Sequence, residues 1–451
     1  MTKPPQFFLE KPNLRDVSQE KFTSFWDKTS EAKRQLLLAA NEPKYLYWDT
    51  FKHKVAGSKI GSPETLWANL KEIRKFLAVA SPITDQNNKN FSSVHLSATY
   101  QILHELDMLL GGKLFDKANM PQDSRESYIT RGVMEEAISS SQLEGAHTTR
   151  AAAKKLLIEN RKPQNESEQM IVNNYKAMLA IDEEYKHSPL SEELLFELHS
   201  VLTTQTLGKD EQKRFRRDSD NIVVQGNIGS ETVATHVPPN EIFLRTEMAR
   251  LIRYANDNLG EKYLHPILKA ILLHFWIGYL HPFTDGNGRL ARALFYWYLL
   301  RHDYWAISYI PLSTVLKKSP MQYAMAYIYS EQDDNDVTYF IDYQLRKMAQ
   351  AAREFQKYIE TRVEKNSEVK EKIIFSHSLN ERQQALLVYF LFDAHATATT
   401  SSHSLVNRIS RQTAAKDLSE LRKLGLLQSK RAGKFIRFFA GKKLRAVNTA
   451  T

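Results

Sequence analysis

The chain has 451 residues, 42% of them hydrophobic and 25% charged, which is the composition of a folded globular protein of two or three domains. It has no cysteine, no apolar run long enough to cross a bilayer and no signal-peptide core at its N-terminus, so disulfides and thiolate chemistry are excluded and we expect a cytoplasmic protein. The formal net charge of +10 is uneven: His403–Val447 holds twelve Lys and Arg against two acids, which limits a nucleic-acid interpretation to that segment.

The first segment, residues 1–85, contains short amphipathic patterns rich in aromatic side chains and is expected to be helical. Ser62 and Pro63 are typical of the N-cap and the first residue of one of its helices. Residues 88–93 are mostly polar and are expected to form a loop. The pattern assigns no function to this segment.

The middle segment, residues 86–362, is predicted to be a helical bundle, with Asn or Ser before several of its helical patterns, as an N-cap requires. Residues 220–237 interrupt the helices with β-branched runs on both sides of a Gly-Asn-Ile-Gly-Ser turn, which predicts a β-hairpin. Two helices, at roughly 263–280 and 289–301, are apolar on nearly all sides and should lie at the centre of the bundle. A long charged helix should follow, with a linker near 363–378.

Residues 281–292, His-Pro-Phe-Thr-Asp-Gly-Asn-Gly-Arg-Leu-Ala-Arg, lie between the two apolar helices. Gly286 and Gly288 precede a helix that should begin near Arg289, so backbone N–H groups and the positive end of the helix dipole can converge on an anion. Arg289 and Arg292 are three apart on that helix, and guanidinium groups bind phosphate oxygens in pairs. The segment therefore predicts a phosphate site.

Two further side chains of this segment supply reactive groups. Asp285 could hold a Mg²⁺ that bridges phosphates. His281 could take a proton from an attacking hydroxyl, because neutral imidazole is a good base near pH 7. Alone, such a histidine is usually a cap or a core residue, and Asp-Gly-Asn-Gly is usually only a turn; the combination indicates displacement at a nucleotide phosphorus. Gly286-x-Gly288-x-x-Ala291 also imitates a dinucleotide fingerprint, but a helix rather than a strand precedes it, so that interpretation fails.

The segment matches at every position the His-Pro-Phe-x-(Asp/Glu)-Gly-Asn-Gly-Arg-x-x-Arg signature of Fic (Fido-fold) proteins, and the chain resembles that family over about residues 90–345. Most members transfer AMP from ATP to a hydroxyl side chain of a protein. The resemblance implies a mainly α fold, a protein adenylyltransferase, ATP as substrate and Mg²⁺ as cofactor. It makes His281 the general base and Asp285 the Mg²⁺ ligand. The nucleotide phosphates would be bound by Gly286, Asn287, Gly288, Arg289, Leu290, Ala291 and Arg292.

The resemblance also implies roles for the hairpin and for a tyrosine. The hairpin at 220–237 is similar to the family's flap, which clamps the target protein by strand pairing. The pairing register would be carried by Ile222, Val223, Val224 and Gln225. The adenine would lie beneath the helix around Tyr323. The expected partners are a hydroxyl-bearing target protein, the chain itself in self-modification, and a second copy in a homodimer.

Residues 139–145, Ser-Ser-Ser-Gln-Leu-Glu-Gly, resemble the family's inhibitory motif, Ser/Thr-x-x-x-Glu-Gly/Asn, on a helix expected over about 130–147. Ser140 and Glu144 are four apart and would share a helix face, with Gly145 completing the motif. An ordinary surface glutamate before a helix-ending glycine is the alternative.

In relatives the glutamate of this motif pairs with the second arginine of the signature, here Arg292, and displaces the γ-phosphate of ATP by charge competition. Ser140 would form a hydrogen bond near Asn287. In some relatives the same glutamate positions a water molecule that removes AMP from a modified protein. Transfer of AMP, its removal, a bifunctional enzyme that does both at the same site, and a DNA-binding regulator whose Fic core senses nucleotide therefore stay open.

Residues 379–446 change in character and are predicted to form a winged helix-turn-helix module. Its second helix should begin near Arg411 with Ser410 as N-cap, and Gly425 stands where a helix-ending glycine belongs. A hairpin turning at Ala432-Gly433 would form the wing. The side chains expected on phosphates of duplex DNA are Arg411, Gln412, Lys416, Lys430, Arg431, Lys434 and Arg437. A module that docks a protein is the alternative.

Overall fold

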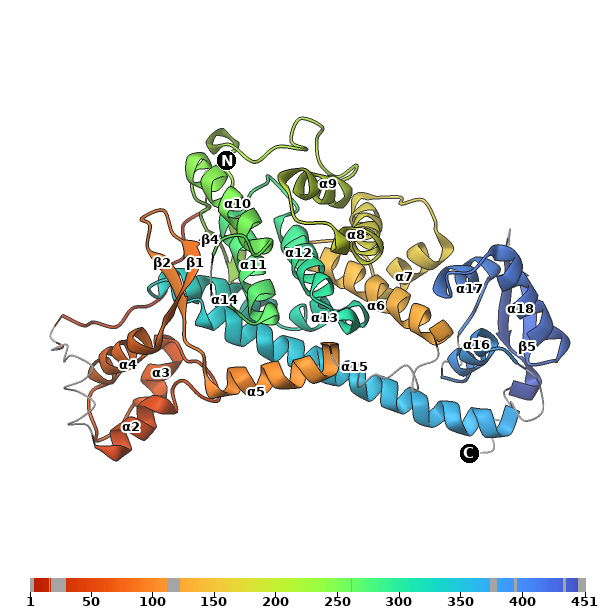
Figure 1. The fold of residues 1–451 in the computed structure, drawn as a ribbon, viewed down its shortest axis with the longest axis horizontal. Coiled ribbons are helices and arrows are strands. Elements are labelled where there is room, and N and C mark those ends of the chain that lie inside the picture. Colours follow the sequence, from red (N-terminus) through yellow and green to blue (C-terminus); the bar gives the residue numbers. More distant parts are fainter. Residues whose placement is uncertain are drawn as a thin grey trace.

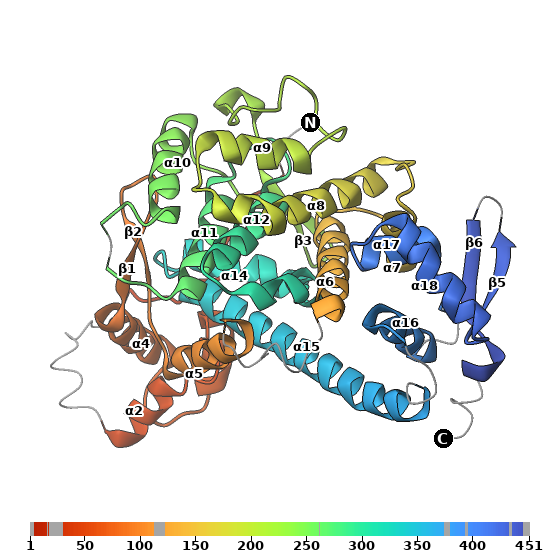
Figure 2. The same cartoon turned by 45° about the vertical axis from the view of Figure 1, so that its right-hand side comes forward.

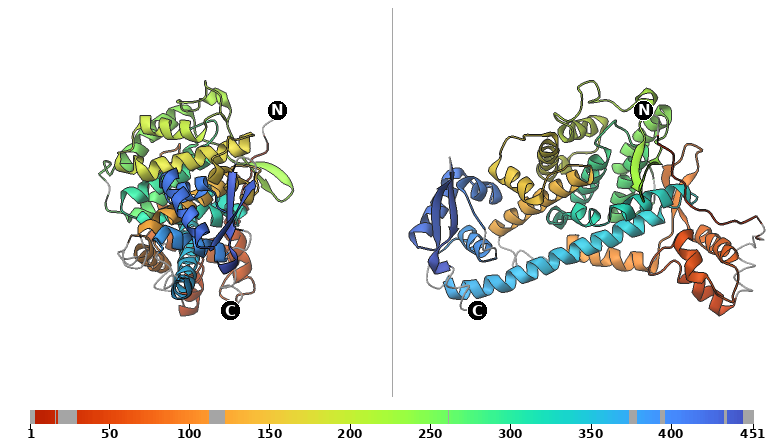
Figure 3. Two further views of the ribbon diagram at one scale, coloured as in Figure 1. Left: turned by 90° about the vertical axis from the view of Figure 1, so that its right-hand side faces the viewer. Right: turned by 180° about the vertical axis from the view of Figure 1, so that it is seen from behind.

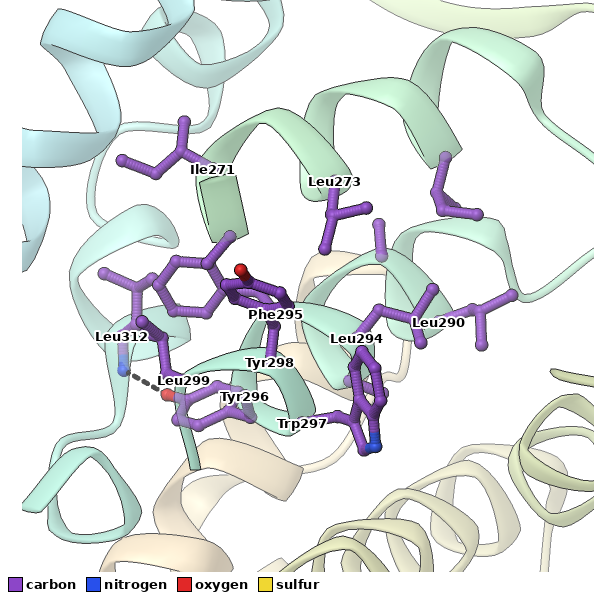
Figure 4. Close-up of a cluster of buried hydrophobic side chains, with 14 of the residues drawn as sticks. Ile271, Leu273, Leu290, Leu294, Phe295, Tyr296, Trp297, Tyr298, Leu299 and Leu312 are labelled. Carbon is purple, nitrogen blue, oxygen red and sulfur yellow. Dashed lines mark hydrogen bonds between the residues drawn. The ribbon is translucent and has the colours of Figure 1, made fainter. Parts of the chain in front are cut away.

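Two apolar helices, α11 (Pro266–Leu280) and α12 (Asn287–Arg301), pack against each other at the centre of the molecule (Figures 1 and 4). Nearly every residue of both is buried, because both are apolar around their whole circumference. Figure 4 shows Leu273 of α11 and Phe295 of α12 in one buried cluster. The prediction of two central helices is confirmed. The loop between them, residues 281–286, is called the signature loop below.

The structure, a computed structural model, describes residues 4–15, 17, 30–111, 122–260, 262–373, 379–392, 396–432 and 435–444. Within these ranges the sheets are three two-stranded antiparallel hairpins: β1 (Val79–Thr84) with β2 (Asn90–Ser93), β3 (Val224–Ile228) with β4 (Glu231–His236), and β5 (Leu427–Ala432) with β6 (Phe435–Ala440). The fold is mainly α, as predicted. None of the helices in these ranges has both the length and the apolar character that crossing a bilayer needs.

Further helices surround the central pair and share one large hydrophobic core with it. Asn165 and Ser191 cap two of them by accepting a hydrogen bond from a backbone N–H, as predicted. These helices are α5 (Ser97–Leu106), α6 (Gln122–Leu143), α7 (Arg150–Glu159), α8 (Glu166–Glu183), α9 (Glu192–Leu202), α10 (Glu241–Ala255), α13 (Leu312–Leu316), α14 (Pro320–Gln332) and α15 (Thr338–Ile373). Shorter turns lie at Asp107–Gly111, Tyr185–His187, Asp218–Asp220 and Trp305–Tyr309.

The N-terminal region forms a smaller helical unit at one end of the molecule (Figure 1). Its helices are α2 (Glu31–Leu38), α3 (Trp48–Val55) and α4 (Pro63–Leu77), and Ser62 caps α4 as predicted. Ile328 of α14 and Tyr339 of α15 belong to the core of this unit, so it is packed onto the bundle.

The prediction of a loop at 88–93 is wrong from residue 90 onward. Asn90–Ser93 is the strand β2, paired with β1. The turn between them is short, and Asn88 provides its left-handed residue with φ of 59°. Polar composition therefore indicated a longer loop than the hairpin needs.

α15 runs without interruption for 36 residues, from the N-terminal unit along the bundle to the C-terminal module (Figures 1 and 3). The prediction of a linker from residue 363 is wrong up to residue 373, because Thr338–Ile373 contains neither proline nor glycine and continues as a helix. Residues 374–378 lie outside the described ranges.

The C-terminal module consists of α16 (Glu381–Phe392), α17 (Thr400–Val406), α18 (Arg411–Lys423) and the hairpin of β5 and β6. It has its own core, to which Leu418 and Leu421 belong. Ser410 caps α18 and Gly425 follows that helix with φ of 74°, as predicted. Gly433, in the predicted wing turn, lies outside the described residues. The module packs against α6 and α7 (Figure 2).

Candidate active site

The signature loop reverses the chain through two residues in the left-handed region. His281 ends α11 with φ of 47°, and Gly286 precedes α12 with φ of 85°. Asn287 braces the loop: its Oδ1 accepts a hydrogen bond from the backbone N–H of Phe283 at 2.9 Å and its Nδ2 donates to the carbonyl of Phe283 at 2.8 Å. These contacts fix the N-terminal end of α12, whose first N–H groups have no acceptor within the helix and suit an anion.

His199 of α9 supports the loop from its buried side, and the sequence did not single it out. Its ring stacks on Phe283 with the centroids 3.7 Å apart, and its Nε2 lies 2.8 Å from the carbonyl oxygen of Asp285. A carbonyl only accepts, so Nε2 carries the proton. Burial lowers the pKa of His199 to about 4, so the ring is neutral at pH 7. A Cβ at Gly286 would press against this ring and against Thr203.

Arg289 lies beneath the loop rather than on its surface. It is fully buried and donates to the carbonyl of Leu202 at 2.7 Å and to Oδ2 of Asp285 at 2.8 Å. It thereby holds Asp285 at the rim of the loop. The contact of Arg289 with a nucleotide phosphate stays a prediction. Leu290 and Ala291 follow it on α12, and their side chains belong to the hydrophobic core.

Asp285 is the residue to which the metal was assigned. Its side chain is 53% exposed, and the ion pair with Arg289 uses Oδ2, which leaves Oδ1 for a cation. In the part of the chain that the structure describes, no group of three or more His, Cys, Asp or Glu could hold a metal by itself. A single carboxylate together with substrate phosphates is a common way of binding Mg²⁺, so Asp285 fits that role only when a nucleotide is bound.

His281 is partly buried at the C-terminal end of α11. Burial lowers its pKa to about 3, and the nearby charges of His236 and Arg216 act in the same direction. The imidazole is therefore neutral at physiological pH, which is the form that a general base needs.

Arg216, a second residue that sequence reasoning missed, fixes the backbone at this point. Its side chain donates to the carbonyl of His281 at 2.8 Å, to that of Leu280 at 3.1 Å and to that of Pro239 at 2.5 Å. Its own backbone N–H donates to the carbonyl of Pro282 at 2.8 Å. No local pattern marks such an arginine, because its acceptors come from segments distant in the chain.

The segment 139–145 brings a carboxylate to the start of α12. Oε1 of Glu144 lies 2.9 Å from Nη2 of Arg292, whose side chain is 2% exposed. A Cβ at Gly288 would collide with the Glu144 carboxylate, so this carboxylate lies directly on the first turn of α12. The Glu144 carboxylate raises the pKa of Arg292 against the lowering effect of burial, so the guanidinium stays charged. Nη1 of Arg292 is buried without a hydrogen-bond partner among the described residues.

Two details of the inhibitory segment differ from expectation. Ser140 contacts Arg292 rather than the surroundings of Asn287: its Oγ accepts from Nε at 2.8 Å and its carbonyl from Nη2 at 3.0 Å. The amide of Asn287 is already occupied by Phe283, which explains the difference. The helix α6 also ends at Leu143, so Glu144 and Gly145 form a turn after it, with φ of 93° at Gly145.

Tyr323, on α14, lies at the arginine end of the site. Its hydroxyl is 2.7 Å from Nε2 of His274, and the charges of Arg292 and Glu144 both act on it. Burial lowers the pKa of His274 to about 3, so this ring is neutral as well. The contact of Tyr323 with adenine stays a prediction.

The predicted hairpin is present as β3 and β4, with corrected limits, and its role as a flap stays a prediction. Val224 and Gln225 lie in β3, whereas Ile222 and Val223 precede it. The turn is at Gly229 and Ser230, and Gly226–Ile228 belong to the strand, because Gly229 with φ of 65° suffices for a tight reversal. Residues 5–7 pair with the other edge of β4: the N–H of Phe7 donates to the carbonyl of Ala234 and the N–H of Ala234 to the carbonyl of Pro5, both at 2.9 Å.

Most of the residues expected to contact DNA in the C-terminal module are exposed, whereas one of them pairs with the bundle. On α18 the side chains of Arg411, Gln412 and Lys416 are exposed, as are Lys430 and Arg431 on β5. Arg437 instead forms an ion pair of 3.4 Å with Glu159 of α7. Lys434 lies outside the described residues.

Comparison with known proteins gives a family match. Residues 189–299 match the model of the Fic/DOC family. The protein adenylyltransferase Fic of Nematostella vectensis is 46% identical over 72 residues, which are 15% of this chain and 16% of that protein. The one of Drosophila melanogaster is 39% identical over 72 residues, 16% of this chain and 14% of that protein. The chain thus spans about a seventh of the length of these relatives.

Among solved structures, a Fic family protein from Desulfovibrio desulfuricans G20 has a TM-score of 0.47 and 18% identity, over 77% of this chain and 97% of that chain. Fic-1 from C. elegans has a TM-score of 0.44 and 15% identity, over 75% of this chain and 92% of that chain. At these TM-scores the structural likeness carries no argument, so the assignment depends on the sequence matches.

The family match covers most of the elements that build the site. Residues 189–299 include α9 with His199, the flap, α11, the signature loop and most of α12 with both arginines. The inhibitory segment 139–145 and the C-terminal module lie outside it. The match to the Fic/DOC family model thus covers residues 189–299 of this chain.

Proposed function

We propose that this protein transfers AMP from ATP to a Ser, Thr or Tyr hydroxyl of a target protein, and that Glu144 restrains the transfer. The observation that carries the proposal is the pairing of Glu144 with Arg292 on the first turn of α12. A helix N-terminus with a buried arginine beside it suits a polyphosphate, and here a carboxylate of the same chain occupies that place. The names of the curated relatives support the activity over a short stretch only.

The residues at the loop have distinct roles in this reaction. The neutral His281 takes the proton from the target hydroxyl, whose oxygen attacks the α-phosphorus of ATP. The bond from that phosphorus to the bridging oxygen breaks, and pyrophosphate leaves with the electron pair. The N–H groups at the start of α12 stabilise the negative charge on the phosphates. Mg²⁺, bound by Asp285 and the phosphates, would neutralise part of the same charge.

Glu144 opposes this reaction through charge. Its carboxylate bonds the guanidinium that the γ-phosphate would need, and it repels phosphate oxygens that approach the same helix end. Nη1 of Arg292 is a buried donor without a partner among the described residues, and a phosphate oxygen would satisfy it.

The test uses the full chain as wild type, Glu144→Gly, Glu144→Gln and Glu144→Gly with His281→Ala, each with α-labelled ATP and Mg²⁺. Label on protein, self-modification included, should rise about tenfold or more in Glu144→Gly, because a competing ion pair worth 1–3 kcal/mol is removed. It should rise less in Glu144→Gln and vanish when His281 is also changed. Glu184→Gly is the matched control, since Glu184 also stands at a helix end and is exposed.

The result that would overturn the proposal is the absence of label in every variant while ATP still binds. The site would then be tested for removal of AMP, with an AMP-modified protein as substrate and Glu144→Gln as the variant that loses activity. In that reaction Glu144 would orient the attacking water, so its loss would decrease turnover rather than increase it.

A second function, binding of duplex DNA, is favoured by the exposed side chains of the C-terminal module. Arg411, Gln412 and Lys416 lie on one helix, and Lys430 and Arg431 on the adjoining hairpin. Affinity for a DNA duplex should fall steeply as salt rises, and the slope of log K against log salt should decrease by about one per lysine or arginine removed. Changing the exposed Lys209 to Ala should leave the slope unchanged. Affinity that is independent of salt would contradict this function.

A further inference from the structure

His236, the last residue of β4, is buried between the flap and the end of α11. The residue is 8% exposed, and its side chain contacts two other elements. Nδ1 lies 2.6 Å from Oε2 of Glu331 on α14, and Nε2 lies 2.7 Å from the carbonyl oxygen of Tyr279 on α11. Tyr279 is two residues before His281, so this one side chain joins the flap to the helix end that carries the base.

Both contacts of His236 require it to donate. The carbonyl of Tyr279 can only accept, and so can the ionised carboxylate of Glu331. A histidine that donates from both nitrogens is an imidazolium. Burial alone would lower the pKa of His236, but the Glu331 carboxylate more than offsets it and the pKa is raised. The contact with Glu331 is thus a charged hydrogen bond, which is stronger than a neutral one.

The next residue on α14, Gln332, binds the N-terminal segment that pairs with the other edge of β4. Gln332 donates from Nε2 to the carbonyl of Phe7 and accepts from the N–H of Leu9, both at 2.9 Å. Phe7 in turn pairs with Ala234 of β4. The C-terminal end of α14 therefore fixes β4 through Glu331 and through the N-terminal segment.

The fixed end of β4 is also the end that leads into the loop region. The chain continues from His236 through Pro239, whose carbonyl accepts from Arg216, and Arg216 bonds the carbonyls of Leu280 and His281. Two buried cationic side chains, His236 and Arg216, thus bind consecutive carbonyls near the end of α11. The flap strand and the end of α11 that carries His281 are therefore held by one group of hydrogen bonds.

We propose that His236 is a positioning residue for AMP transfer: it fastens the flap strand to the end of α11 and so sets where a target held by the flap meets His281. The expected effect on AMP transfer rests on the proposed function, whereas the attachment of β4 to α11 is a property of the fold. Loss of the fastening leaves the phosphate site intact but misplaces the hydroxyl, and a displacement of about 1 Å can cost on the order of a hundredfold in rate.

The test compares His236→Phe with His187→Phe, each in the Glu144→Gly chain. Phenylalanine keeps the ring and removes both hydrogen bonds, and His187 is an exposed histidine on the turn after α8. Hydrogen exchange at the amides of residues 224–236 should become at least about tenfold faster in His236→Phe, since two buried hydrogen bonds are lost. Self-modification at saturating ATP should slow about tenfold or more, with the KM for ATP within about twofold.

A merely structural role would lower ATP binding and transfer together, and that result overturns the proposal. Unchanged flap exchange overturns it as well, as does faster exchange with undiminished transfer. Where His236→Phe does not fold, Glu331→Gln is measured instead and should change exchange and transfer in the same direction by a smaller factor. Faster flap exchange together with no transfer in any Glu144→Gly chain would support the fastening and overturn the proposed function.

Discussion

Three histidines around the signature loop are held neutral by burial, and this makes stability depend on pH. Burial lowers the pKa of His199 to about 4 and those of His274 and His281 to about 3. In the unfolded chain a histidine has its ordinary pKa near 6.5. Between pH 6.5 and about 4 the unfolded chain therefore binds more protons than the folded one, so the free energy of unfolding decreases as pH falls through this window. Well above pH 6.5 all three are neutral in both states and contribute no slope.

Urea unfolding at pH 7.5, 6.0 and 5.0 measures this effect. Each of the three histidines contributes at most about 1.4 kcal/mol per pH unit inside the window. His236, with its raised pKa, acts in the opposite direction. His274→Phe should reduce the loss of stability between pH 7.5 and 5.0, whereas a change of the exposed His187 to Gln should not. An identical pH dependence in wild type and His274→Phe would contradict the burial argument.

At the residue scale the sequence identified the part of the site that is contiguous in the chain. His281, Asp285 and Arg292 are recognisable because one short segment carries them, and their spacing has chemical meaning. His199, Arg216 and His236 are single polar residues in separate segments, and only the tertiary fold brings them to the loop. The same limit explains Ser140, whose partner was expected near Asn287 and is Arg292.

At the scale of elements, α6 is held in place by a buried carboxylate on which the contact between Glu144 and Arg292 depends. Glu136 accepts from the N–H of Ser313 at 2.8 Å, from the hydroxyl of Ser313, and from the hydroxyl of Tyr296 at 3.0 Å. It lies one turn before Ser140, which contacts Arg292. These bonds join α6 to α12 and to the start of α13, and so they set the position from which Glu144 reaches Arg292.

Glu136→Ala should therefore lower stability and weaken the restraint. It leaves the buried N–H and hydroxyl of Ser313 without their acceptor, whereas the Tyr296 hydroxyl keeps the carbonyl of Ile310 at 2.7 Å. The loss should cost about 2–4 kcal/mol in the free energy of unfolding. Labelling from ATP should rise in this variant although Glu144 is intact. The matched control is Glu135→Ala on the same helix, because Glu135 pairs with the exposed Arg150 and such a pair contributes about 1 kcal/mol or less. Equal loss of stability in both variants would contradict the anchoring role.

Elements were predicted best where one physical pattern dominates. The apolar pair α11 and α12, the capped starts of α8, α9 and α18, and the flap hairpin all followed from periodicity, capping and turn residues. The errors fall where two signals compete. Polar residues predict a loop at Asn90–Ser93, which is a strand, and the charged stretch after residue 362 predicts a linker although it continues α15. Composition alone does not separate an exposed helix from a linker.

At the scale of the whole molecule, the C-terminal module is joined to the bundle through ion pairs as well as packing. Arg408 pairs with Asp182 at 3.7 Å and with Glu183 at 3.4 Å, both on α8, and Arg437 pairs with Glu159 of α7. The guanidinium of Arg131 on α6 also lies 5.1 Å from the ring centre of Tyr389 on α16. The helix that ends in the inhibitory segment is therefore in direct contact with the module.

Reversing two of these charges should loosen the module from the bundle. In Arg408→Glu with Arg437→Glu, attraction is replaced by repulsion at sites worth up to about 1 kcal/mol each, so exchange of buried amides in α17 should accelerate about five- to thirtyfold. Exchange in α11, which packs against α12 at the centre of the bundle, should stay constant. Arg422→Glu is the control, since Arg422 is exposed on α18 and donates to Ser429 of the same module. Because α6 lies between the module and Glu144, exchange at residues 136–143 reports whether this loosening reaches the contact between Glu144 and Arg292. Unchanged exchange in α17 would show that apolar packing alone holds the module in place.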